Sequence, residues 1–223
     1  MAAESMRVEL QDDGVYELTC SQGHITRTVL QNPKFEVLFD IGANAILDGY
    51  CREAVSSFAS SLERFYEFAI RVLAVNSQIN EAQFKKGWAA VAAQSERQYG
   101  AFVFLWLFHV GEIPKLPETW HAKFRNDVIH NGKIPHRDEA IRFGDGVLNV
   151  IRPMLRVLRE KFERGTSHVI VADLLRRHKI DDKPNSTLGM STILGASIDM
   201  AQEHHQLSLS DHLAQMSGRR ARV

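Results

Sequence analysis

Cysteine is scarce in this chain, which has only Cys20 and Cys51 among its 223 residues. Two cysteines cannot build a disulfide-rich scaffold. Cys20 and His24 resemble half of a zinc knuckle, but a structural zinc site needs four ligands and Cys51 falls on an expected helix. We therefore interpret residues 20–24 as a turn and expect neither a metal site nor a cofactor.

A surplus of charge of one sign is also absent, because 27 Lys and Arg residues balance 27 Asp and Glu residues. A neutral chain with a pI of about 7.2 has no general affinity for polyanions, so a nucleic-acid contact needs a local basic patch. The sequence contains neither a Gly-x-x-x-x-Gly-Lys phosphate loop nor a Gly-x-Ser-x-Gly nucleophile elbow. The corresponding nucleotide-binding and serine-hydrolase classes are therefore unsupported.

Long hydrophobic runs are missing as well. The longest, residues 101–110, contains His109 and is much shorter than the roughly 20 residues that cross a bilayer. The first ten residues carry Glu4, Arg7 and Glu9 where a signal peptide would have an apolar run. We expect a cytoplasmic protein with no membrane partner.

Apolar residues nevertheless make up 44% of the chain, which is enough for a folded core. Two β-prone runs at residues 15–20 and 25–30 flank a turn with Gly23 and predict a β-hairpin. From about residue 41, apolar residues recur every three or four positions, which predicts helices. The expected helices cover residues 42–76, 80–95, 97–110, 117–131, 135–164, 169–178, 192–204 and 208–216.

The expected fold class is mostly α. We expect a helical bundle at residues 41–164, preceded by a hairpin region at residues 1–40 and followed by a small helical appendage at residues 165–223. Gly144 and Gly146 are expected to weaken the helix at 135–164, and Pro153 to kink it.

Arg125, Asn126 and His130 are the residues most typical of a catalytic site. On one helix, Asn126 and His130 share a face at a spacing of four, whereas Arg125 lies about 140° from His130. The dipole at a helix C-terminus favours the cationic form of a His, and Arg offers a planar charged fork that matches a phosphate. The two side chains together suit a phosphodiester substrate.

This arrangement resembles the HEPN superfamily, all-helical proteins whose ribonuclease members carry an Arg, often a polar residue directly after it, and a His a few residues beyond. The likeness covers about residues 42–164, where a long first helix with an acidic face is followed by the motif helix and a closing helix. It implies a metal-independent endoribonuclease in which the ribose 2′-OH attacks the adjacent phosphate. The products would be a 2′,3′-cyclic phosphate and a 5′-OH end.

The resemblance assigns acid–base catalysis to His130 and phosphate stabilisation to Arg125, with Asn126 orienting His130 or a phosphate oxygen. One His cannot easily act as acid and base in a single step, and the family implies a homodimer in which both motifs face one cleft. We therefore expect a homodimer with a composite site. Glu63 and Glu67 are expected to orient Arg125.

Further candidates surround this motif. A local excess of positive charge would suit an RNA backbone, and Asp127 and Asn131 are supporting candidates beside the motif. The expected substrate-binding residues are His121, Lys133, His136 and Arg137.

Two alternatives stay open at this stage. Arg125 would form an ordinary salt bridge with Glu63 or Glu67 while His130 packs at a helix end, or the whole domain would be an inactive HEPN-like module that dimerises or senses a partner or nucleotide. A role in prokaryotic antiphage defence or a toxin system is implied by the resemblance alone, as is a protein regulator. Gly132 replaces the Tyr that adenylyl-accepting HEPN toxins carry two residues after the His, so regulation at that position is not expected.

Overall fold

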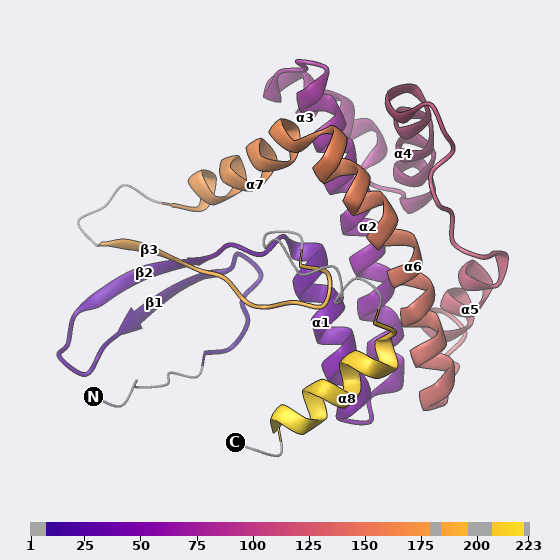
Figure 1. The fold of residues 1–223 in the computed structure, drawn as a ribbon, viewed down its shortest axis with the longest axis horizontal. Helices are drawn as coiled ribbons and strands as arrows, with labels where there is room; N and C mark the ends of the chain where they lie inside the picture. The colour runs from indigo at the N-terminus through magenta and orange to yellow at the C-terminus, as the bar shows by residue number, and fades with distance from the viewer. Residues whose placement is uncertain (1–7, 179–183, 196–206, 221–223) are drawn as a thin grey trace.

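The computed structural model describes residues 8–178, 184–195 and 207–220. Its elements in this part of the chain are a small three-stranded sheet near the N-terminus and eight α-helices (Figure 1). The expected mostly helical class is confirmed. None of the described helices is long and apolar enough to cross a bilayer.

The expected hairpin is present as β1 (Val15–Thr19) and β2 (Ile25–Leu30), which pair antiparallel. Gly23 lies in its turn with a φ of +80°, which favours a residue without a side chain. A third strand, β3 (Asn185–Leu188), was not predicted and pairs parallel to β2. Its four residues alternate too little to signal a strand, and backbone pairing with β2 defines it.

The single helix expected at residues 42–76 is wrong, because the structure has two helices there. α1 (Lys34–Leu47) and α2 (Cys51–Asn76) are separated by Gly49, whose φ of +85° is incompatible with a continuing helix. The apolar spacing continues across this break, which hides it from the sequence pattern. α1 packs closely on α2, since a Cβ at Gly42 would lie 2.6 Å from the Phe58 ring.

The next three helices lie near their expected positions, with ends that differ by a few residues. α3 (Glu81–Val91) begins at a capping box formed by Asn80 and Gln83, and α4 (Ser95–Val110) ends at Gly111 in a left-handed conformation. An extended connector with two prolines then leads to α5 (Thr119–Ile129).

α6 (Arg137–Lys161) runs through Pro153 and closes the bundle. Gly144 and Gly146 were expected to weaken it, but both are packing positions. A Cβ at Gly144 would lie 2.4 Å from the Leu209 side chain, and one at Gly146 would lie 2.0 Å from the His121 ring. These glycines therefore allow other elements to approach α6.

The C-terminal region differs from expectation at two places. α7 (Glu163–Arg177) begins six residues before the expected start at residue 169. Gly165 lies inside this helix, where an added Cβ would lie 2.9 Å from the Val72 carbonyl oxygen. Residues 192–195 are not helical, and the remainder of the helix expected at 192–204 lies outside the described residues. The last expected helix is present as α8 (Leu209–Arg220).

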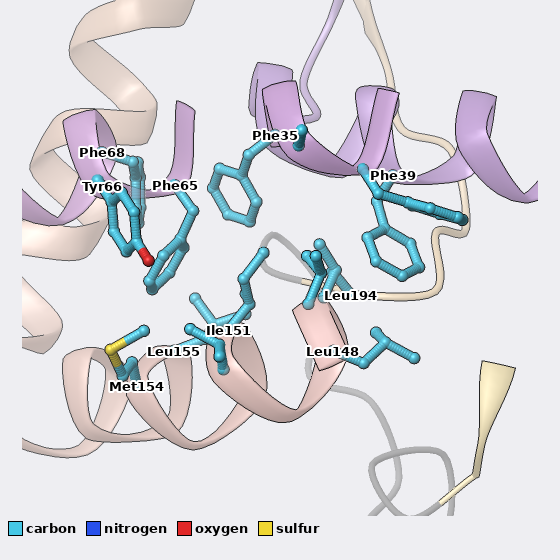
Figure 2. Packing of buried hydrophobic residues seen from close by; sticks show 14 of the residues in the cluster. Phe35, Phe39, Phe65, Tyr66, Phe68, Leu148, Ile151, Met154, Leu155 and Leu194 are labelled. Carbon is cyan, nitrogen blue, oxygen red and sulfur yellow. The ribbon is translucent and has the colours of Figure 1, made fainter. Parts of the chain in front are cut away.

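The core lies where α1, α2 and α6 meet, and Figure 2 shows aromatic side chains of α1 and α2 facing the aliphatic side chains of α6. Full burial of each large apolar side chain contributes about 1.5–3 kcal/mol. The labelled members are Phe35, Phe39, Phe65, Tyr66, Phe68, Leu148, Ile151, Met154, Leu155 and Leu194.

A buried polar cluster joins α1 to the C-terminal segment. The Glu36 carboxylate, fully buried, accepts hydrogen bonds from the Asn32 amide (2.8 Å) and the Thr192 hydroxyl (2.6 Å). The Ile193 N–H donates to the Asp40 carboxylate at 3.0 Å. Burial raises the pKa of Asp40 to about 7. The hydrogen bond from Ile193 lowers this pKa, and the nearby Glu36 raises it further.

The hairpin region was expected to end at residue 40. This residue lies inside α1, so the helix begins before the expected boundary.

Candidate active site

The Arg125, Asn126 and His130 motif lies on the last turns of α5, at the surface of the bundle. His130 is the C-cap residue, and its backbone N–H donates to the Asn126 carbonyl at 2.9 Å. Gly132, with a φ of +73°, lets the chain turn away immediately afterwards. The helix end therefore fixes the backbone that carries the His130 side chain.

Arg125 is held by an acidic residue of α2. Its Nη2 atom lies 3.0 Å from Glu63 Oε1, and its Nη1 atom donates to the Asn126 side-chain oxygen at 3.3 Å. The two charged side chains retain 28% and 31% of their exposure, so the guanidinium is anchored but open to solvent on one side. The pairing with Glu63 is the contact expected both of an orienting carboxylate and of an ordinary salt bridge.

Glu67 does not pair with Arg125, contrary to the sequence-based expectation. Its carboxylate instead accepts a hydrogen bond from Arg64 (2.5 Å) and lies 3.6 Å from Arg71 Nε. Glu63 and Glu67 are one helical turn apart, and Glu63 is the one that pairs with Arg125 of α5.

His130 is exposed, and no residue in the described ranges forms a hydrogen bond with its imidazole. Its position at a helix C-terminus places it against the negative end of the dipole. The side chain of Asn126 is engaged by Arg125. An unengaged imidazole can exchange a proton with a bound ligand, and an anchored guanidinium can stabilise negative charge.

The supporting candidates Asp127 and Asn131 stabilise the end of α5. The Asn131 amide donates to the Asp127 carboxylate at 3.0 Å, and the Lys133 N–H donates to the Asp127 carbonyl at 3.0 Å. These contacts hold the loop that follows His130, which is a structural contribution.

The basic residues after the motif are mostly engaged within the protein. Lys133 donates to Glu139 at 2.6 Å, and its Nζ lies 4.6 Å from the centre of the Phe124 ring. Arg137 donates to the Ile46 carbonyl at 2.8 Å, and His136 is the exposed N-cap residue of α6. Glu139, which sequence reasoning missed, offsets the charge of Lys133; its position at N3 of a capping box was the available signal.

The expectation that His121 binds substrate is wrong, because its side chain is buried. His121 is only 6% exposed and its ring lies 4.2 Å from that of Trp120 and 5.1 Å from that of Phe143. Both ring nitrogens lack a hydrogen-bond partner among the described residues, and burial lowers the pKa of this imidazole. The aromatic neighbours at α5 and α6, together with Gly146, make His121 part of the packing between these helices.

Five large apolar side chains of α4 and of the connector that follows it are exposed. Figure 1 shows that this extended connector joins α4 to α5. We call these side chains the α4 apolar surface. Its members, all exposed, are Phe104, Leu107, Phe108, Ile113 and Leu116.

Comparisons with protein-family models, with curated proteins and with solved structures each find no match to this chain. Within the described ranges, no three His, Cys, Asp or Glu side chains are grouped as they would be around a metal ion. The candidate site therefore rests on its own geometry: a fixed cation, a free imidazole and an open surface.

Proposed function

We propose that this chain is a metal-independent endoribonuclease of the HEPN type. The observation that carries the proposal is the pairing of an anchored Arg125 with an exposed, unengaged His130 five residues later on α5. Catalysis of phosphodiester transesterification needs a positioned cation and a group that exchanges protons near neutral pH. This surface supplies both.

The proposed reaction forms a bond between the ribose 2′-oxygen and the adjacent phosphorus and breaks the bond to the 5′-oxygen. His130 accepts the proton of the 2′-OH, and a second imidazole protonates the departing 5′-oxygen. Arg125 stabilises the negative charge that develops on the phosphorane, while Glu63 keeps its guanidinium oriented. The products are a 2′,3′-cyclic phosphate and a 5′-OH end.

The second imidazole is His130 of the partner subunit in the proposed homodimer. The α4 apolar surface supports this assembly, since Phe108 and Phe104 remain 81% and 63% exposed on an isolated chain. Apolar surfaces of this kind are typical of protein interfaces. Two-fold symmetry would bring this surface of both subunits together, and the connector at residues 111–118 leads from it directly to α5 in each subunit.

The proposed setting is the cytoplasm, in antiphage defence or a toxin system, with RNA as substrate. Uncontrolled RNA cleavage limits growth, so a protein regulator is part of this proposal.

The test is cleavage of a mixed single-stranded RNA by the purified protein in EDTA. We expect wild-type cleavage and a loss of at least 100-fold in His130→Ala, because general acid–base catalysis contributes about 10²–10⁴-fold. Arg125→Ala should lose about 10²–10³-fold, the usual effect of removing a group that stabilises an oxyanion. Matched controls are His24→Ala and Arg97→Ala, which remove exposed side chains of the same types far from α5 along the chain. Both controls should cleave as wild type does.

The alternative is a catalytically inactive HEPN-like module that dimerises or senses a partner or nucleotide. The contact that favours it is the same Arg125–Glu63 ion pair, which by itself is an ordinary link between α5 and α2. Under this alternative the wild type cleaves no RNA, and Arg125→Ala lowers only the free energy of unfolding. Equal activity in wild type and His130→Ala would also reject the proposed site.

A further inference from the structure

A groove of about 630 Å³ lies between α2, α3, α7 and the start of α1, away from the Arg125 and His130 motif. Figure 1 shows α3 and α7 at the same end of the bundle. Ligand pockets for small organic molecules usually have volumes of about 300–1,000 Å³. The groove is therefore large enough for a small metabolite.

Charged side chains form a continuous network along the α2 and α3 sides of the groove. Arg64 pairs with Glu67, Arg71 lies between Glu67 and Glu81, and Lys85 pairs with Glu81. Three cations thus share two carboxylates, which leaves an excess of one positive charge. An anion entering the groove would complete this network.

Arg71 is the residue of this network best prepared to bind an anion. Its guanidinium carbon lies 4.5 Å from the centre of the Phe84 ring, which fixes the plane of the fork. Its contacts with Glu67 (3.6 Å) and Glu81 (3.8 Å) are longer than hydrogen bonds, whereas Arg64 contacts Glu67 at 2.5 Å. Arg71 is thus oriented without being tightly engaged, and its planar fork matches a phosphate.

The groove also has apolar walls. Phe35 and Phe68 line it from the core side, and Phe84, Val75 and Ile79 line it nearer the surface. These side chains would contact an aromatic or aliphatic body while Arg71 binds the acidic end. Inorganic phosphate alone would leave the apolar walls uncovered.

We propose that this groove binds a small organic phosphate monoester, with the phosphate at Arg71 and Lys85 and the apolar body against Phe84 and the core side. The proposal is independent of RNA cleavage, because it uses none of the residues assigned to that reaction. It applies equally to an enzyme and to an inactive module.

Isothermal titration calorimetry of the full chain with phenyl phosphate tests this proposal. We expect saturable binding of one molecule per chain, at least tenfold tighter than inorganic phosphate and at least tenfold tighter than phenol. Equal binding of inorganic phosphate would contradict the role of the apolar walls. Equal binding of phenol would contradict the role of the cations, and absence of saturable binding would overturn the proposal.

Variants locate the binding to this groove. Arg71→Gln should weaken phenyl phosphate binding at least tenfold, and the matched control Lys86→Gln, an exposed α3 cation outside the groove, should change it less than twofold. Ala172→Trp, which fills the groove from α7 without altering its charge, should also weaken binding at least tenfold. Wild-type affinity in both Arg71→Gln and Ala172→Trp would overturn the assignment.

For one variant we expect tighter binding of phenyl phosphate, a change that a folding defect cannot produce. Glu81→Gln removes the carboxylate shared by Arg71 and Lys85, so phenyl phosphate should bind at least threefold more tightly. Unchanged or weaker binding in this variant would contradict a phosphate at these two cations.

Discussion

At the residue scale, the size of a single side chain decides how closely α5 packs against α6. His121 of α5 occupies space that Gly146 of α6 leaves open, and the Trp120 and Phe143 rings flank the imidazole. The sequence indicated a helix with two weakening glycines. It could not indicate that these glycines receive side chains from other elements, because that contact exists only in the folded chain.

Gly146→Ala is predicted to destabilise the protein by about 1–3 kcal/mol, the usual cost of overpacking a core. The added methyl group would lie 2.0 Å from the His121 ring, so α5 must shift. Gly87→Ala is the control, because its Cβ meets nothing within 4 Å and α3 is helical there, so it should stabilise by about 0.5–1 kcal/mol. Urea unfolding measures the free energy of unfolding of both variants. Equal changes in the two variants would contradict the contact between residue 146 and the His121 ring.

The Asp40 carboxyl predicts a pH dependence of stability. Its pKa is raised to about 7 in the folded protein, so the folded state holds a proton that the unfolded state releases at acidic pH. Its contribution to the free energy of unfolding is complete below about pH 4 and is lost as pH rises through about 7. Asp40→Asn should therefore flatten the urea-unfolding profile between pH 4 and pH 7. An unchanged slope would show that Asp40 titrates normally.

At the element scale, the helices were predicted where apolar spacing is regular and missed where backbone geometry decides. The spacing runs through Gly49, yet a positive φ there separates α1 from α2. β3 has no alternating pattern and exists through its hydrogen bonds to β2. For the candidate site, the sequence placed Arg125 and His130 on one helix, while the choice of Glu63 over Glu67 required the packing of α2 on α5.

Glu63→Gln tests the contact between α2 and α5 in catalysis. An ion pair of this exposure contributes up to about 1 kcal/mol, so the rate of RNA cleavage should decrease by up to about fivefold. Glu53→Gln, an exposed glutamate on the same helix, is the control and should leave the rate unchanged. A rate in Glu63→Gln equal to that of the control would mean that Arg125 needs no orienting partner.

At the scale of the whole molecule, segments far apart in the sequence form one structure. β3 completes the N-terminal sheet, and the segment around Thr192 binds the polar side chains of α1. Sequence periodicity detects local structure and not contacts between residues more than 150 positions apart. It therefore assigns these segments to separate regions. The exposed side chains of the α4 apolar surface support the proposed homodimer.

Phe108→Arg is predicted to weaken the proposed dimer at least tenfold. Burial of a Phe side chain contributes about 1.5–3 kcal/mol, and each 1.4 kcal/mol changes a dissociation constant about tenfold. Leu175→Arg, at an exposed apolar position on α7, is the control. Sedimentation equilibrium measures the dimer dissociation constant of each variant. Equal dissociation constants for Phe108→Arg and wild type would place the interface elsewhere.

Mass spectrometry of the ends produced from a defined single-stranded RNA in EDTA tests the proposed RNA cleavage. Wild type should produce 2′,3′-cyclic phosphate and 5′-OH ends, and His130→Ala should produce at least 100-fold fewer of both. Fragments ending in 3′-OH and 5′-phosphate would contradict attack by the ribose 2′-OH and, with it, the assigned roles of His130 and Arg125.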